Sequence, residues 1–374
     1  MSNTPRRPRS APGAAGTPKT TAEPLPGLDL DRLGPWLAEN LEGVSTGSTT
    51  KGELSATHIS GGKSNLTYVV SDGTHEWIVR RPPLGHVLAT AHDMKREHTV
   101  ITALRDTDVP VPHTYAFCGD EEVLGAPFYV MEKVDGQPYR YARELEPLGP
   151  ERTKAISEQL IDVMAALHAV DPADVGLSEF GRPEGFLSRQ VRRWKKQLEA
   201  SHSRDLPAAD ELHSLLEARV GAAEAASTGP GIVHGDYRLD NVLTDSTDRI
   251  RAVVDWEMAT LGDPVTDLAI LLTYQKMAEV SGDGTVTDVS NAPGWLTEDE
   301  IIARYDAASP RDLSEFGFYR GLAAYKLAAI LEGIHYRYLK GQTVGPGFDT
   351  IGDGIHPLLD MGINAMKENT GRVS

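Results

Sequence analysis

The segment 232–257 constrains the fold more than any other part of the chain, because it joins an apolar run, a polar loop and a second apolar run. It begins Ile232-Val233-His234-Gly235-Asp236, and a polar turn at 245–249 separates the two later runs. Apolar runs on both sides of a short polar turn predict an antiparallel hairpin. With the turn centred near Asp248, the pairing places Asn241 opposite Asp255.

Three polar residues of this segment predict phosphoryl transfer. An amide and a carboxylate at facing positions, here Asn241 and Asp255, supply the hard oxygen ligands that Mg²⁺ prefers. Asp236 lies five residues before Asn241, within reach of an attacking hydroxyl beside a metal-bound phosphate, and is the candidate base. Any one of these features alone is ordinary loop chemistry, and His234 is interpreted as a structural loop residue. Their occurrence together, in this order around a hairpin, predicts a functional site.

Composition excludes several classes of partner. The 374 residues carry 37 Lys and Arg against 54 Asp and Glu, a net charge of −17, which disfavours nucleic acid and anionic membrane surfaces. The one cysteine, Cys118, cannot form an internal disulfide, and no apolar run reaches membrane-spanning length. We therefore expect a soluble, cytoplasmic protein with a small-molecule partner, no nucleic acid and no membrane. The sequence leaves the oligomeric state open.

The chain divides by composition into three parts. Residues 1–26 are rich in Pro, Ser, Thr and Arg and predict a disordered tail, with a transit peptide as the rival interpretation. Residues 27–134 predict a small β-rich lobe with a helix from about Leu28, a hairpin at 66–79, a helix at 89–105 and a strand at 127–134. Residues 135–374 predict a larger, mainly helical lobe that carries the 232–257 segment.

At His234, Gly235, Asp236 and Asn241 the sequence resembles the aminoglycoside phosphotransferase family, and the resemblance extends to Asp255 and across nearly the whole ordered chain. It implies an α+β, two-lobed protein-kinase-like fold that uses ATP and Mg²⁺. By this resemblance Asp236 is the base, Asn241 and Asp255 hold the metal, and the acceptor is a small-molecule hydroxyl.

Three strings, at 62–68, 80–83 and 167–171, resemble one branch of that family more closely. This branch includes the kinase-like domains fused to acyl-CoA dehydrogenases, and it implies a hydroxyacyl-CoA acceptor. An aminoglycoside acceptor and a catalytically silent nucleotide-binding module remain alternatives. A protein kinase is disfavoured because no recognisable activation segment follows Asp255.

A glycine-rich turn in the predicted small lobe is a candidate phosphate-binding loop. Small residues let backbone amides approach phosphate, and the residues in question are Gly61, Gly62, Ser64 and Asn65. An ordinary hairpin turn is the competing interpretation.

An ion pair between Arg80 on a strand and Glu97 on the following helix is expected, similar to the lysine–glutamate pair that holds kinase phosphates. Arg81 is the alternative phosphate contact, because adjacent strand residues point to opposite faces. By resemblance, the stretch that includes Glu132, Lys133 and Val134 is the hinge that contacts adenine. An edge strand and a turn is the plainer interpretation.

On the acceptor side, a helix near residue 190 has a basic face formed by Arg189, Arg192 and Lys196. A solvated surface is the default interpretation of such a face, and an anion-binding surface for a CoA ester is the alternative. The segment 279–295 is expected to be a long loop. Asp263 is expected to cap a helix, and Asp267 to brace the loop around Asp236.

Overall fold

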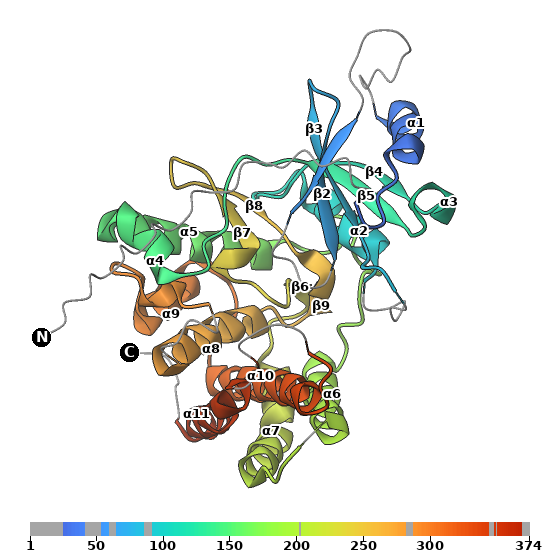
Figure 1. Cartoon of the computed structure of the whole chain (residues 1–374). Coiled ribbons are helices and arrows are strands. Elements are labelled where there is room, and N and C mark those ends of the chain that lie inside the picture. Colours follow the sequence, from blue (N-terminus) through green and yellow to red (C-terminus); the bar gives the residue numbers. More distant parts are fainter. Residues whose placement is uncertain are drawn as a thin grey trace, which may run out of the picture. The chain divides into compact units, whose positions relative to one another are not determined.

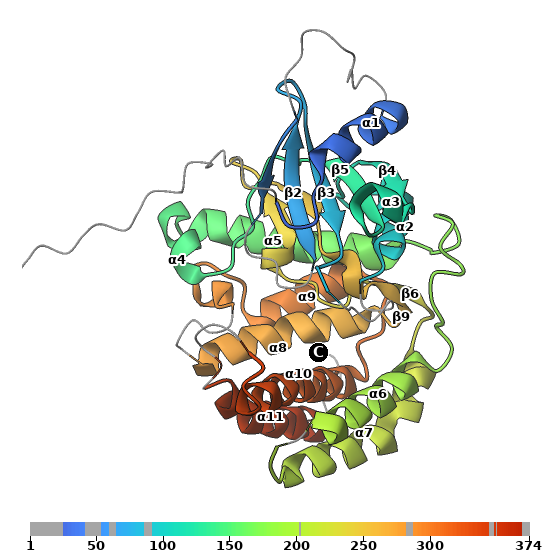
Figure 2. The ribbon, with the colours of Figure 1, turned by 45° about the vertical axis from the view of Figure 1, so that its right-hand side comes forward.

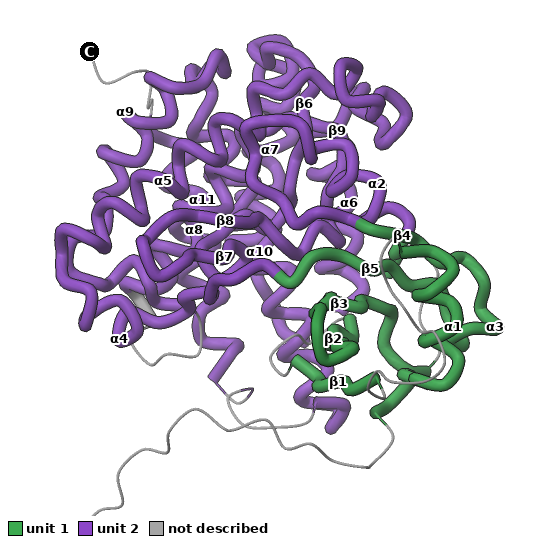
Figure 3. Tube along the Cα trace, turned by 90° about the horizontal axis from the view of Figure 1, so that it is seen from above, with its two compact units in different colours: residues 1–94, 115–133 green, residues 95–114, 134–374 purple. Residues whose placement is uncertain are grey.

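The computed structural model describes residues 25–41, 54–59, 65–85, 92–201, 203–281, 287–343, 348 and 350–368 (Figure 1). The predicted tail therefore lies almost entirely outside the described residues. The chain divides into two compact units, Met1–Met94 with Tyr115–Lys133 and Lys95–Thr114 with Val134–Ser374 (Figure 3).

The segment 95–114 belongs to the second unit, although it precedes the last strands of the first. Its contacts explain this, because the guanidinium of Arg96 donates two hydrogen bonds to the carbonyl of Ala259 and the N–H of Val253 donates to the carbonyl of Pro110. The predicted division into 27–134 and 135–374 does not assign 95–114 to the second unit. That assignment depends on contacts between residues far apart in sequence. That the units are a nucleotide-binding lobe and a catalytic lobe stays a prediction.

The first unit is built on a five-stranded sheet with strand order β1-β2-β3-β5-β4. Its strands are β1 (Ser55–His58), β2 (Leu66–Ser71), β3 (Glu76–Arg81), β4 (Thr114–Cys118) and β5 (Phe128–Glu132). The pairs β1–β2, β2–β3 and β3–β5 are antiparallel. The predicted hairpin at 66–79 is thus confirmed.

Helix α1 (Leu30–Asn40) covers the core of the first unit. Asp29 caps it by accepting hydrogen bonds from the N–H groups of the first turn. Its apolar residues recur at helical spacing, so Leu33 and Leu37 are fully buried and Trp36 meets the ring of Phe128 edge-on at 4.8 Å between centroids. A short helix α3 (Glu121–Leu124) packs beside it.

The second unit is mainly helical (Figure 2). Its helices are α2 (Met94–Leu104, with Met94 in the first unit), α4 (Ala142–Leu145), α5 (Pro150–Ala169), α6 (Phe186–Ser201), α7 (Pro207–Ala226), α8 (Val265–Ser281), α9 (Glu298–Ala308), α10 (Phe316–Leu339) and α11 (Ile355–Lys367). Helix α10 lies at the centre of its own group and packs against α6, α7, α8 and α11. Short 3₁₀ turns connect several elements: η1 (Glu146–Leu148), η2 (Leu239–Asn241), η3 (Trp256–Met258), η4 (Val289–Asn291) and η5 (Ile351–Gly354).

Two small two-stranded sheets carry the segment that the sequence singles out. Strand β6 (Gly231–Val233) pairs with β9 (Thr260–Gly262), and β7 (Val242–Thr244) pairs with β8 (Ile250–Val253). The predicted pairing of Asn241 with Asp255 is wrong by one residue, because Val242 faces Val253 and the carbonyl of Asn241 accepts from Val254 N–H. A register shift at Leu243/Thr244 lies next to the turn. Counting residue pairs outward from one central turn residue does not allow for such a shift.

Several predicted bounds are also corrected. Helix α2 is first described as helical at Met94, β5 is shorter than predicted at both ends, and α8 continues to Ser281 into the expected loop. Residues 86–91 and 282–286 lie outside the described residues. Among the helices that the structure describes, none combines the length and apolar character needed to span a membrane.

Candidate active site

A buried carboxylate on α8 holds the loop around Asp236. Asp267 accepts a hydrogen bond from the backbone N–H of His234 at 2.7 Å and another from that of Gly235 at 2.8 Å. The loop leaves β6 and turns sharply at Gly235, whose φ is +88°. A Cβ at this glycine would lie 2.8 Å from Cβ of Met258, so the close approach requires glycine. Asp267 therefore braces the loop, as predicted.

His234 is a structural residue of this loop. It is fully buried, and its ring packs against Trp256 at 4.7 Å between centroids. Its Nε2 lies 3.0 Å from the carbonyl oxygen of Val254, and its Nδ1 accepts from the N–H of Asp236 at 3.3 Å. These contacts hold the loop against the strand end that precedes Asp255, which agrees with assigning His234 no catalytic role.

Asp236 and Asn241 contact each other directly. Nδ2 of Asn241 donates to the backbone carbonyl of Asp236 at 2.8 Å and to its Oδ2 at 3.1 Å. Both amide hydrogens are used in this way, so Oδ1 of Asn241 points elsewhere and is available to a ligand. The carboxylate of Asp236 is thus oriented by the residue predicted to hold the metal.

Arg238 is a third member of the cluster that the sequence analysis did not single out. Its Nε lies 3.3 Å from Oδ2 of Asp236 and 3.2 Å from Oδ1 of Asp240, and its guanidinium lies over the ring of Tyr274 at 4.8 Å. Burial disfavours its charge, but the neighbouring carboxylates outweigh burial and raise the pKa of Arg238 above its ordinary value. Its place two residues after Asp236 was the available signal.

Burial also shifts the pKa values of two neighbours of Arg238, Asp240 and Tyr274. Burial raises the pKa of Asp240, with Arg238 acting in the opposite direction. Burial, together with the charge of Asp236, raises the pKa of the Tyr274 hydroxyl well above its usual range. Tyr274 therefore stays a neutral group near the candidate base.

Asp255 lies two residues after the end of β8 and has a left-handed backbone conformation, with φ +66° and ψ +55°. Only Asp248 and Asp255 among the described non-glycine residues have positive φ, and such strain is concentrated at functional positions. The conformation redirects the chain from strand to the turn η3, so that Asp255 leaves the hairpin ladder.

The donor set fits Mg²⁺. Asn241 offers an amide oxygen without a hydrogen-bond donor among the described residues, and Asp255 offers a carboxylate from the adjacent strand end. The described residues contain no group of three or more His, Cys, Asp and Glu that could hold a metal. A two-residue oxygen set suits Mg²⁺, which usually keeps waters and substrate phosphates as its other ligands, and does not suit a tightly held Zn²⁺.

Behind the loop, Asp267 faces a second buried group. Nε2 of His168 lies 3.4 Å from Oδ2 of Asp267, and its Nδ1 lies 2.7 Å from the hydroxyl of Tyr305. Burial alone would raise the pKa of Asp267, but its hydrogen bonds, including the one from Gly235, lower the pKa below its ordinary value. Burial lowers the pKa of His168, so the histidine is neutral at pH 7 while Asp267 is ionised.

In the first unit, the two candidate arginines have different surroundings. Arg81 is buried, and its guanidinium donates to the backbone carbonyls of Gly27 and Leu124 and to that of Pro82. Arg80 is half-buried and donates to the hydroxyl of Thr67 at 3.2 Å. Arg81 is therefore occupied with structural contacts, which leaves Arg80 as the candidate phosphate contact.

Of the candidate phosphate loop, Asn65 is described and buried, with its Oδ1 2.9 Å from Nδ1 of His92. Gly61, Gly62 and Ser64 lie outside the described residues. Their role stays a prediction.

The other nucleotide-side candidates are divided between the units. Glu97, on α2, is buried in the second unit, whereas Arg80 belongs to the first, so their predicted ion pair remains a prediction. Glu132 ends β5, and the ammonium of Lys133 lies 2.5 Å from Glu76, where the neighbouring strands β3 and β5 end side by side. Val134 is the first residue of the second unit after β5.

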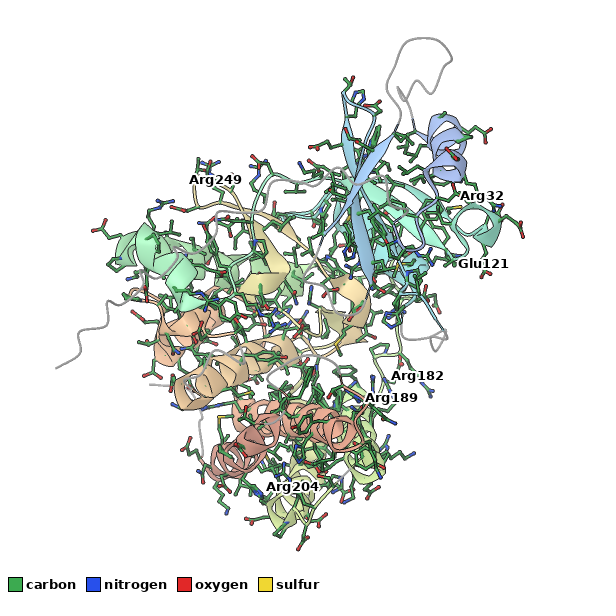
Figure 4. The ribbon with its side chains drawn as sticks, viewed as in Figure 1. Arg32, Glu121, Arg182, Arg189, Arg204 and Arg249 are labelled. Carbon is green, nitrogen blue, oxygen red and sulfur yellow. The ribbon has the colours of Figure 1, made fainter. Side chains whose placement is uncertain are left out.

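On the acceptor side, α6 has the two faces that the sequence predicts. Its apolar face is buried through Val191, Trp194 and Leu198. Arg189 turns back toward the preceding loop, where it donates to backbone carbonyls of Arg182 and Glu184 (Figure 4). It is therefore a poor candidate for an anion contact.

The remaining cations of α6 differ in their partners. Lys195 lies 3.3 Å from Asp210 and 3.5 Å from Glu199. Arg192 and Lys196 are exposed and, within the described part of the chain, make no hydrogen bond or ion pair through their side chains. These two cations are free to bind an anion.

A cavity of about 520 Å³ lies among α6, α7 and α10. Its charged lining residues are Lys195, Glu199, Arg204, Asp205 and Asp210. Both cations are already paired with carboxylates, so the cavity suits a cationic ligand better than a phosphate.

Asp263 has the structural role that the sequence predicts. Its Oδ1 accepts from the N–H of Val265, the first residue of α8, and its Oδ2 accepts from the hydroxyl of Tyr319 at 2.7 Å.

Comparison with known proteins places this fold in one class. The crystal structure of a protein from Ralstonia eutropha jmp134, provisionally described as an aminoglycoside phosphotransferase, matches with a TM-score of 0.77 and 31% identity over 91% of this chain and 98% of that one. A thermostable variant of aminoglycoside phosphotransferase APH(4)-Ia, crystallised with AMP-PNP and hygromycin B, has a TM-score of 0.58 and 16% identity over 89% of this chain and 98% of its own. At that identity the second likeness shows the fold alone. The molecule is therefore a two-lobed, kinase-like phosphotransferase fold.

The family follows from the sequence match. Residues 55–298 match the phosphotransferase enzyme family (APH), and the chain belongs to this family. Acyl-CoA dehydrogenase family member 11 of Rattus norvegicus is 30% identical over 362 residues, which cover 95% of this chain and 46% of the relative. The chain thus spans about half the length of the curated relative it matches.

Proposed function

We propose that this protein transfers the γ-phosphate of ATP to the hydroxyl of a small molecule, with Asp236 as the base and Mg²⁺ held by Asn241 and Asp255. The observation that carries the proposal is the direct contact between Asn241 and the carboxylate of Asp236, beside the left-handed Asp255. This arrangement separates orientation of the hydroxyl from binding of the metal, as phosphoryl transfer requires.

In the proposed reaction, the acceptor oxygen bonds to the γ-phosphorus while the bond from that phosphorus to the bridging oxygen of ADP breaks. The acceptor proton passes to the carboxylate of Asp236. Asn241 holds that carboxylate in place through a hydrogen bond, and Arg238 does so through an ion pair. The position of this carboxylate matters most, because the transition state of phosphoryl transfer is loose and depends mainly on how the reacting groups are placed. Bound Mg²⁺ would neutralise charge on the phosphate oxygens.

The nucleotide contacts are proposed from both units separately. Arg80 is the proposed phosphate contact of the first unit, because Arg81 is committed to backbone carbonyls. Asn65 and the stretch that contains Glu132, Lys133 and Val134 are proposed to contact the nucleotide, together with Glu97 as the partner of the phosphate-binding arginine. The AMP-PNP bound to a structure of the same fold supports ATP as the donor.

For the acceptor we propose a hydroxyacyl-CoA. The likeness to acyl-CoA dehydrogenase family member 11 supports this class, and the unpaired Arg192 and Lys196 on α6 suit the phosphates of a CoA ester. An aminoglycoside is the second candidate, because the acidic cavity among α6, α7 and α10 suits a polycationic sugar.

Release of ADP with Mg²⁺ and ATP, measured across hydroxyacyl-CoA thioesters, free hydroxy acids, amino alcohols and aminoglycosides, tests the proposal. We expect turnover with hydroxyacyl-CoA that disappears in Asp236→Ala and persists in Asp306→Asn, a change at an exposed position of α9. Turnover with aminoglycosides alone would replace the acceptor class. Nucleotide binding without turnover on any acceptor would favour a catalytically silent module.

A further inference from the structure

Lys326, in the middle of α10, carries a cation that the proposed reaction does not use. Its ammonium donates a hydrogen bond to the carbonyl oxygen of Gly235 at 2.8 Å and lies 5.6 Å from the centre of the Trp194 ring. In the part of the chain that the structure describes, this is its one hydrogen bond, and it makes no ion pair. A half-buried ammonium with a single neutral acceptor still loses much of its hydration, so its presence requires an explanation.

The carbonyl that Lys326 contacts belongs to the peptide bond joining Gly235 to Asp236. The N–H of the same glycine is bound by Asp267, 2.8 Å away on α8. Two ions of opposite charge from two different helices, the buried Asp267 and the half-buried Lys326, therefore hold Gly235 at both its N–H and its carbonyl. Because the backbone at this residue is left-handed and in close contact with Met258, the loop has little freedom to absorb the loss of either contact.

The charges around Lys326 explain how an ammonium survives there. Burial lowers the pKa of Lys326 and the nearby Arg193 lowers it further, while the carboxylates of Asp236 and Asp267 act in the opposite direction. Trp194 adds its ring face on the α6 side. The cation is thus balanced by the two carboxylates that define the loop.

We propose that Lys326 is a positioning residue, which fixes the peptide before Asp236 and so aims the carboxylate at the acceptor hydroxyl. This inference rests on the proposed function. Lys326 acts through the loop and touches neither nucleotide nor acceptor, so its loss should lower kcat and leave the KM for ATP unchanged. If Lys326 served packing alone, Lys326→Met would leave kcat unchanged, because methionine matches the length of the lysine stem and would fill the same space.

The test compares Lys326→Met with Lys326→Arg and with Lys276→Met, a control on α8 whose lysine is half-exposed and pairs with Glu279. We expect Lys326→Met to lower kcat by about 10- to 100-fold, since small misplacements of a reacting group cost this much, with the KM for ATP within about twofold. Lys326→Arg, which keeps a donor and a charge, should recover part of the loss. The control should match the wild type.

A second readout needs no acceptor. Amide hydrogen exchange of the segment 232–241, measured with Mg²⁺ and AMP-PNP present, should be faster in Lys326→Met and return toward the wild-type rate in Lys326→Arg. Unchanged exchange and unchanged kcat in Lys326→Met would overturn the proposal. If the wild-type protein turns over no acceptor, the proposed function fails, and the exchange rates alone decide whether Lys326 holds the loop.

Discussion

The side-chain amide of Asn241 spans the backbone carbonyl and the carboxylate of Asp236, at 2.8 and 3.1 Å. One residue therefore links the candidate base to the candidate metal position. The orientation of Oδ1 of Asn241 depends on Asp236, to which the amide group of Asn241 is hydrogen-bonded. The orientation of the Asp236 carboxylate depends in turn on the amide hydrogens of Asn241.

This link predicts a double effect for Asn241→Ala. Loss of the amide oxygen should raise the Mg²⁺ concentration needed for half-maximal phosphotransfer, and loss of the amide hydrogens should lower kcat at saturating Mg²⁺ by about 10²-fold or more. Titration of the rate with Mg²⁺ measures both. Asn364→Ala, at an exposed position on α11, is the control. An unchanged Mg²⁺ requirement would remove Asn241 from the metal site.

Asp267→Ala should destabilise the second unit. The variant leaves the N–H groups of His234 and Gly235 without their acceptor in a buried position, at a cost of about 2–5 kcal/mol in the free energy of unfolding. Urea denaturation followed by tryptophan fluorescence measures the loss. A change below about 0.5 kcal/mol, the range of ordinary surface substitutions, would contradict the bracing role.

His168 predicts a pH dependence of stability. Its pKa in the folded protein is below the ordinary 6.5, so the unfolded chain binds a proton that the folded chain does not. Its contribution to stability is complete above pH 6.5 and falls as the pH drops toward the folded pKa, by up to about 1.4 kcal/mol per pH unit. The slope between pH 6.5 and 5 should be smaller in His168→Gln. Equal slopes in the two proteins would show that His168 does not titrate differently on folding.

Replacing Arg81 should chiefly lower stability, whereas replacing Arg80 should chiefly weaken the binding of ATP. Arg81→Met removes hydrogen bonds from a buried guanidinium to backbone carbonyls and should cost about 2–3 kcal/mol of stability. Arg80→Met should weaken the binding of ATP much more than Arg81→Met does. Calorimetric unfolding and nucleotide titration on both variants check this, and the reverse pattern would assign the phosphate contact to Arg81.

Local patterns in the sequence predicted the elements that depend on them. Alternation and turn residues gave the β2–β3 hairpin, and helical spacing gave α1 and the buried face of α6. The register of the β7–β8 hairpin was missed because the turn is centred one residue earlier than predicted, with Thr244 opposite Ile250. The shift at Leu243/Thr244 then recovers only half of that difference. Strand β9, with three residues, carries too short a pattern to be recognised.

The candidate site likewise contains residues that the sequence predicted and one that it did not. Asp236, Asn241 and Asp255 lie within one short segment, so their spacing was visible in the sequence. Lys326 comes from a helix about 90 residues further along, where a lone lysine in an apolar stretch carries no local sign of its partner. Only the packing of α10 against α6 and α8 brings its ammonium to the loop.

The most direct test of the account is the rate of phosphotransfer by Asp255→Asn. Asparagine tolerates the left-handed backbone at this position, so the variant removes a charge from the metal site without adding backbone strain. We predict that it unfolds at the wild-type temperature and loses turnover at every Mg²⁺ concentration. Full activity in a folded Asp255→Asn protein would contradict the metal site and, with it, the proposed mechanism.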